Sequence, residues 1–213
     1  MTNIEIMEGF HHPGQITKTV EEIVKEFQLH EKLDSINIKH PPLDHPIDMN
    51  YLFPEERRLE LEIVDSLDNL EGRIRHELMH VVDQLDADFG YKRKREPGSG
   101  TTQLRRYKYL WNVYIDSRLQ RAGKPAYATK EAREEELGEC WPELSEETRL
   151  ALFEHLWILQ PLAQKQLLQL SNNIFKFSKD LKALSKGRGE RLRRFKTLED
   201  LRHFARWGDV AEG

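Results

Sequence analysis

Two histidines and a glutamate stand close together in the first half of the chain. The run is His76-Glu77-Leu78-Met79-His80, with the histidines at positions i and i+4. In an α-helix these positions share one face, so both imidazoles can reach a single metal ion. In the known chemistry of this short motif, the histidines bind zinc and the glutamate moves a proton from water to a leaving amine. The spacing therefore predicts His76 and His80 as zinc ligands and Glu77 as general base.

This motif requires a helix, and the residues around it have a helical pattern. Apolar residues recur at three- and four-residue intervals from Leu70 to Leu85, which predicts an amphipathic helix. The two histidines fall on a different stripe of that helix, together with Asp83. We expect the apolar stripe in the core and the histidine stripe facing a cleft. The alternative is a pair of histidines on a solvated helix face.

A catalytic zinc site has three protein ligands and one open position. Asp83 lies about five residues past the midpoint of the histidines, roughly 7.5 Å along the helix axis, which a short side chain does not span. The third ligand is therefore expected on another helix, and Asp116 is our candidate, because a buried carboxylate there needs a cation or a metal. Asn112 shares its helical face. The alternatives are a surface Asp116 paired with Arg118, or one of the acidic residues Glu134, Glu135, Glu136 and Glu139.

Other polar side chains have candidate supporting roles. Asp83 could hold the second ring nitrogen of a ligand histidine, cap its own helix, or pair with Arg73 or a basic loop residue. A peptidase also needs a donor for the oxyanion. The candidates for that donor are Tyr109, Tyr127 and His155, although a histidine such as His155 is more often packed within a helix.

Composition limits the class of protein. The chain has 213 residues, of which 33% are charged, and a formal net charge of -4. This length allows one compact unit with a core and a cleft, and this charge gives no overall attraction to nucleic acid. The single cysteine, Cys140, excludes an intramolecular disulfide and fits a reducing compartment. Neither a secretion signal nor a membrane span is recognisable, so we expect a cytoplasmic protein.

The segments before the motif are expected to supply the apolar residues that pack against the motif helix. We expect an irregular start over 1–16, a helix over 17–27, a strand over 35–39 and a proline-rich loop with His40 and His45. Those two histidines are candidate ligands, although solvated histidines are more typical of such loops. A strand is expected over 59–64, where a helix is the alternative, and a peptide substrate could add to its exposed edge beside the metal-binding helix.

The elements after the motif are expected to be helical. A basic loop over 86–100 precedes a long helix over 101–122. Further helices are expected over 129–140, 145–157, 162–177 and 197–207, with a basic stretch over 179–196. The predicted fold is α+β and predominantly helical, with a small sheet on the N-terminal side. The metal-binding region would span 1–125, and a helical region over 126–213 would pack on it as part of one compact unit.

The motif resembles that of the zincin metallopeptidases. Extended to Asp83, it looks like the His-Glu-x-x-His-x-x-Asp run of the anthrax lethal factor catalytic domain and its bacterial cytosolic relatives. In the gluzincin branch, the resemblance implies zinc held by His76, His80 and a glutamate on a later helix, with Glu77 as general base. Where a thermolysin-like pattern has Glu-x-x-x-Asp, this chain has Asn112-x-x-x-Asp116, so Asp116 would have to replace the glutamate. The resemblance covers residues 59–119.

These observations predict a zinc-dependent metallopeptidase that acts on a peptide or protein substrate, without a membrane or nucleic-acid partner. The alternative is a non-catalytic protein with a structural or vestigial metal site, acting through protein or nucleic-acid binding. Nucleic acid could bind to two basic stretches, Arg93–Arg95 and Lys186–Lys196, and such binding would have a steep salt dependence. The negative net charge and the absence of interleaved aromatic residues argue against that last reading.

Overall fold

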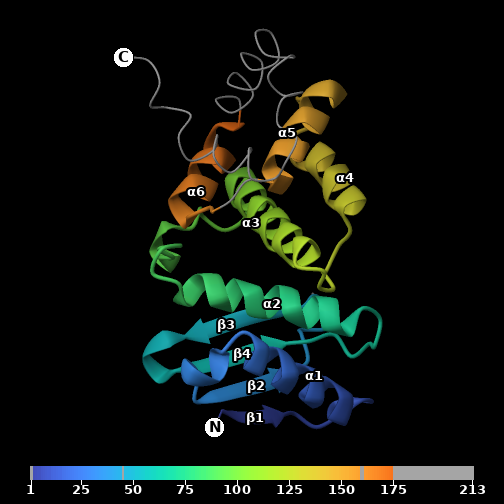
Figure 1. Cartoon of the computed structure of the whole chain (residues 1–213), viewed down its shortest axis with the longest axis vertical. Helices are drawn as coiled ribbons and strands as arrows, with labels where there is room; N and C mark the ends of the chain where they lie inside the picture. Colours follow the sequence, from blue (N-terminus) through green and yellow to red (C-terminus); the bar gives the residue numbers. More distant parts are fainter. Residues whose placement is uncertain (1, 45, 159–160, 175–213) are drawn as a thin grey trace. The chain divides into compact units, whose positions relative to one another are not determined.

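The structure is a computed structural model that describes residues 2–44, 46–158 and 161–174 (Figure 1). The expected basic stretch over 179–196 and helix over 197–207 lie outside these residues. The chain divides into two compact units. The first combines Met1–Arg95 with Ile115–Ala132, and the second combines Glu96–Tyr114 with the described residues from Arg133 onward. This division differs from the expected one at residue 125, because one long helix contributes to both units.

The first unit contains a four-stranded sheet. Its strands are β1 (Asn3–Ile6), β2 (Ser35–Lys39), β3 (Met49–Phe53) and β4 (Arg58–Glu62), in the order β1-β2-β4-β3. The first three strands of that order run parallel, and β3 pairs antiparallel with β4. The same unit contains the helices α1 (Pro13–Glu26) and α2 (Leu70–Leu85) and the 3₁₀ turns η1 (Leu29–Glu31), η2 (Pro54–Glu56) and η3 (Arg93–Arg95).

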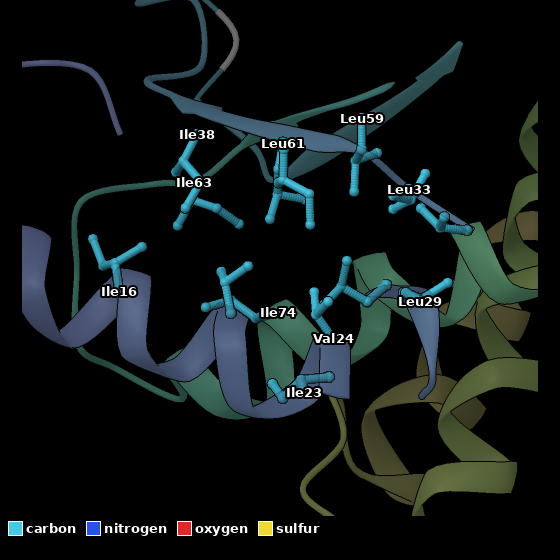
Figure 2. Packing of buried hydrophobic residues seen from close by; sticks show 14 of the residues in the cluster. Ile16, Ile23, Val24, Leu29, Leu33, Ile38, Leu59, Leu61, Ile63 and Ile74 are labelled. Atoms are coloured by element: carbon cyan, nitrogen blue, oxygen red, sulfur yellow. The ribbon is translucent and has the colours of Figure 1, made fainter. Parts of the chain in front are cut away.

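The core of this unit lies between the sheet and its two helices. Alternate residues of β2 and β4 are buried, among them Ile38, Leu59 and Leu61. Figure 2 shows these side chains pointing toward Val24 of α1 and Ile74 of α2. Successive side chains of a strand point to opposite faces, and an α-helix repeats every 3.6 residues. Apolar residues spaced two apart in the strands and three or four apart in the helices therefore gather on one face of each element. The apolar stripe of α2 is therefore buried, as expected.

The second unit is helical. It contains most of α3 (Thr102–Arg121), with α4 (Lys130–Cys140), α5 (Glu146–Ile158) and α6 (Gln164–Asn172). Large aromatic side chains fill its interior: the rings of Tyr109 and Trp141 are 5.7 Å apart between centroids, and Phe153 is fully buried. Among the described residues, none of the helices is long and apolar enough to cross a membrane.

The α+β fold is confirmed, and so are the expected elements over 35–39, 59–64, 70–85 and 101–122. Two strands were not expected. β1 lies within the stretch predicted to be irregular, and β3 follows the proline-rich loop. Both are edge strands without a buried residue. β1 alternates polar and apolar residues over only four positions, which is a weak signal, and β3 has no alternation. The strand over 59–64 is β4, which is paired on both sides, so its predicted exposed edge is wrong.

Candidate metal centre

Helix α2 brings the motif residues together. One ligand atom from each of His76, Glu77 and His80 lies within 4.8 Å of the other two. His76 and Glu77 are buried, while His80 is half-buried. The two imidazole rings are 5.0 Å apart between centroids and meet edge to face. Two imidazoles and a carboxylate at this separation can bind one divalent transition metal ion.

Close packing fixes the start of α2. The helix follows Asn69, whose backbone is left-handed with φ of 45°. The Asn69 side chain donates hydrogen bonds from Nδ2 to the backbone oxygens of Ala126 and Tyr127, over 2.9 and 3.0 Å. A Cβ atom at Gly72 would lie 2.4 Å from the Ala126 oxygen, so only glycine allows this approach. The segment around Tyr127 is thereby held against α2, close to His76.

Asp116 contacts His76 directly. Its Oδ1 lies 2.8 Å from Nδ1 of His76 and also accepts a hydrogen bond from the backbone N–H of Tyr127 over 3.1 Å. Asp116 is fully buried. A carboxylate accepts hydrogen bonds, so Nδ1 carries the proton and Nε2 has the lone pair for a metal. Asp116 is thus next to the predicted site, but it is outside the group formed by His76, Glu77 and His80.

Glu77 is held by a strand rather than by another helix. Nδ2 of Asn50 in β3 donates a hydrogen bond to Oε2 of Glu77 over 2.7 Å. The Asn50 amide is oriented in turn by Gln84, which donates to its Oδ1 over 2.9 Å. Burial raises the pKa of the Glu77 carboxyl to about 7, and the nearby His76 and the Asn50 hydrogen bond oppose that rise. Glu77 therefore exchanges a proton near neutral pH, which suits a general base.

Asp83 has a different partner from those considered in the sequence. Its Oδ2 lies 2.6 Å from Nη2 of Arg118, and its side chain is almost fully buried. This ion pair joins the last turn of α2 to the last turn of α3. Asp83 therefore helps to hold together the two helices that carry His76 and Asp116. Arg118, which was the alternative partner considered for Asp116, pairs with Asp83, and Asp116 is fully buried rather than at the surface.

The three oxyanion candidates lie in different places. The ring of Tyr127 is 5.3 Å from that of His76, between centroids. The hydroxyl of Tyr109 donates instead to the backbone oxygen of Arg133, over 2.7 Å, inside the second unit. His155 is also in the second unit, where burial lowers the pKa of its imidazole. Of the three, Tyr127 is the one that the first unit places beside the motif.

The remaining candidate ligands are not in the group with His76. His40 stacks on Phe10 with ring centroids 3.8 Å apart, and His45 is outside the described residues. In the acidic helix α4, Glu136 pairs with Arg133 and Glu139 pairs with Arg105. Among the described residues, His76, Glu77 and His80 form the one group of three or more such side chains close enough to share a metal ion.

Sequence reasoning did not identify Asn50, or the role of Arg73. Arg73 makes two hydrogen bonds to the carboxylate of Asp48, over 2.6 and 3.1 Å, and also donates to the backbone oxygen of Val64 over 2.6 Å. This network ties the start of β3 to α2. The strand β3 itself was not predicted, so no signal in the sequence placed Asn50 next to Glu77.

No protein-family model, curated protein or solved structure matches this chain. The grouped side chains of α2 are therefore the observation from which a function can be inferred.

Proposed function

We propose that this protein is a zinc-dependent peptidase. The observation that supports the proposal most strongly is the approach of His76, Glu77 and His80 within 4.8 Å of one another on one buried helix. Imidazole nitrogens are preferred zinc ligands, and a carboxylate between them is in position to act on water. The resemblance of this motif to that of the zincins supports the same function.

In the proposed site, His76 and His80 bind zinc. Asp116 orients His76 through Nδ1, as carboxylates commonly do for metal-binding histidines. This role differs from the expectation that Asp116 is itself the third zinc ligand. The bond between its Oδ1 and Nδ1 of His76 lies on the side of the ring away from Nε2, so the same oxygen does not also reach an ion bound at Nε2.

Bound zinc would lower the pKa of a water molecule and polarise the scissile carbonyl. Glu77 accepts the proton of that water and delivers it to the amine of the leaving group. Burial raises the pKa of Glu77 to about 7 in the metal-free protein, and a zinc ion bound beside it would lower that pKa again and favour the carboxylate that accepts the proton. Tyr127 is the candidate donor to the developing oxyanion, because its ring lies next to that of His76.

A peptide substrate would add to β3 in an extended conformation. β3 is the terminal strand of the sheet on the side of α2, and β4 pairs with it on one edge. The other edge can accept the backbone of a peptide. Asn50 in this strand contacts Glu77, so a peptide paired with β3 would pass close to the proposed base.

A second function is favoured by the position of Glu77 within the group. Its carboxylate is as close to the histidines as a ligand would be. If Glu77 fills the third coordination position, no base remains, and the metal site would be structural. In that case the protein would act through binding rather than catalysis.

Metal analysis and a cleavage assay on the full-length protein distinguish these two functions. The peptidase should contain zinc and cleave members of a mixed peptide library, detected by mass spectrometry. The Glu77→Gln variant should keep its zinc and lose cleavage. If the site is structural, Glu77 is a zinc ligand, so the Glu77→Gln variant should lose its zinc. The wild-type protein should then cleave none of the peptides.

A further inference from the structure

Three consecutive basic residues form an exposed charged patch in the first unit. Arg93, Lys94 and Arg95 make up the turn η3, and all three side chains are exposed. We call these residues the basic triad. Within the described part of the chain, none of the three forms an ion pair, although the unit contains many paired arginines. Their positive charges are therefore available to a binding partner.

The basic triad follows α2, the helix whose last turn contacts the edge strand β3. The hydrogen bond from Gln84 to Asn50 joins the middle of β3 to the last turns of α2. The chain leaves α2 at the end toward which β3 points (Figure 1), and it reaches η3 a few residues later. Burial raises the pKa of the Tyr51 hydroxyl, and the charge of Arg93 opposes that rise. The charge of Arg93 therefore influences Tyr51, the central residue of β3.

Acidic residues on the neighbouring strands do not neutralise this patch. Nζ of Lys39 lies 2.8 Å from Oε2 of Glu60 and 3.4 Å from Oε1 of Glu62. Glu60 also pairs with Arg58 over 2.5 Å. These carboxylates of β4 thus have cationic partners, Lys39 on β2 and Arg58 on β4. The basic triad therefore keeps its own positive charge, although the whole chain has a formal net charge of -4.

We propose that the edge of β3 and the basic triad together bind an extended peptide segment rich in aspartate and glutamate. The peptide backbone would pair with β3, and its acidic side chains would contact Arg93, Lys94 and Arg95. Strand addition supplies affinity through main-chain hydrogen bonds, while neighbouring charges supply specificity. This inference rests on the proposed function in one respect, namely that the bound acidic segment is the substrate of the zinc site.

A peptide fits this surface better than a nucleic acid does. The open edge of a strand presents alternating N–H and C=O groups, which match a peptide backbone. A nucleic acid would gain from the basic triad alone, because its sugar-phosphate backbone lacks the N–H donors that pair with a strand edge. An acidic peptide gains from both features, because its backbone and its side chains each have a partner.

Fluorescence anisotropy tests the proposal with labelled peptides of known charge. The protein is the full-length, zinc-loaded Glu77→Gln variant, which should not cleave the probe. The first probe alternates glutamate with threonine, and the second has glutamine in place of glutamate. We expect the glutamate peptide to bind about tenfold more tightly, as a few exposed ion pairs allow. Replacing Arg93, Lys94 and Arg95 by glutamine should abolish this preference.

Two controls separate this surface from general electrostatic attraction. The first control replaces by glutamine three lysines that are exposed elsewhere in the same unit, Lys18, Lys25 and Lys32. This variant has the same net charge as the triad variant and should still bind the glutamate peptide more tightly than the glutamine peptide. A glutamate peptide with N-methylated backbone nitrogens should bind weakly, because it lacks the donors needed to pair with β3. Equal loss in both triple variants, or full affinity of the N-methylated peptide, would overturn the proposal.

An oligonucleotide probe tests the competing ligand. Tighter binding of single-stranded DNA than of the glutamate peptide at the same salt concentration, with loss in the triad variant, would assign this surface to nucleic acid and overturn our proposal. The proposed function can fail separately. If the wild-type protein contains no zinc or cleaves no peptide, the proposed peptidase function is refuted, but peptide binding that depends on the basic triad is not. If the protein cleaves peptides but binds the glutamate and glutamine peptides equally, only the present inference is refuted.

Discussion

Asn50 in the edge strand donates a hydrogen bond to the Glu77 carboxylate over 2.7 Å. This bond joins two parts of the proposed site that are far apart in the sequence. The same strand that would pair with a peptide holds one oxygen of the proposed base, while the other oxygen has no such restraint from Asn50. In the proposed site, the strand that would position a substrate through its backbone also orients the base through the Asn50 side chain.

Replacing Asn50 by alanine should reduce cleavage without removing zinc. Glu77 would lose the donor that fixes Oε2, and its carboxylate could rotate away from the reacting water. We expect turnover to fall about tenfold, within the range for groups that orient a metal site. The measurements are kcat, with a peptide found in the library screen as substrate, and the zinc content of the purified variant. Asn37→Ala changes a half-buried asparagine in β2 and should leave both values unchanged.

Glu77 should make the stability of the metal-free protein depend on pH. Its carboxyl pKa rises from 4.5 to about 7 on folding because of burial. The folded state therefore binds this proton more tightly than the unfolded state, so the free energy of unfolding decreases as pH rises through the window between those values. The loss is on the order of 3 kcal/mol above that window, by about 1.4 kcal/mol for each unit of pKa.

Urea unfolding of chelator-treated protein at about pH 5 and about pH 8 measures this loss. The wild-type protein should lose more stability between these conditions than Glu77→Gln, which has no carboxyl group to ionise. An identical pH dependence for both proteins would show that Glu77 ionises normally in the folded state.

Variants of Asp116 decide between its two roles. If Asp116 orients His76, Asp116→Ala should weaken zinc binding by about tenfold to a hundredfold. Asp116→Asn should weaken it less, because the amide oxygen can still accept the hydrogen bond from Nδ1. If Asp116 is a zinc ligand, both variants should lose zinc to a similar extent. Competition with a chromophoric chelator gives the affinities, and circular dichroism checks that each variant is folded.

Gly72→Ala should destabilise the protein, although alanine is the better helix former. The added Cβ atom would lie 2.4 Å from the backbone oxygen of Ala126, so the segment next to Tyr127 would have to move. We expect a loss of about 1–3 kcal/mol in the free energy of unfolding. Gly14→Ala in α1 is the control, since nothing lies within 4 Å of its added Cβ. Thermal unfolding that ranks the two variants the other way would contradict this packing.

The motif and its helix could be predicted because both depend on local spacing. His76 and His80 approach each other wherever residues 76–80 are helical, and the apolar pattern from Leu70 to Leu85 indicates a helix. The approach of Asp116 to this helix was also expected, from the high cost of burying a carboxylate alone. Its contact with Nδ1 of His76 depends on how α2 and α3 pack, and no spacing in the sequence specifies that.

Asn50 could not be predicted for a related reason. β3 has five residues, all half-buried, and it follows a loop that contains Pro41, Pro42 and Pro46. A short strand without a buried face has no period by which to recognise it. Its place beside α2 is set by pairing with β4 and by the contact of Arg73 with Asp48, and both are interactions between distant residues.

The most direct test of the proposed site is the zinc content of the purified full-length protein after expression in zinc-supplemented medium. The wild-type protein should contain one zinc ion per chain, and His80→Ala should contain almost none. His30→Ala, which changes an exposed histidine in η1, should match the wild type. A wild-type protein without zinc, or His80→Ala with full zinc occupancy, would contradict the assignment of His76 and His80 as metal ligands.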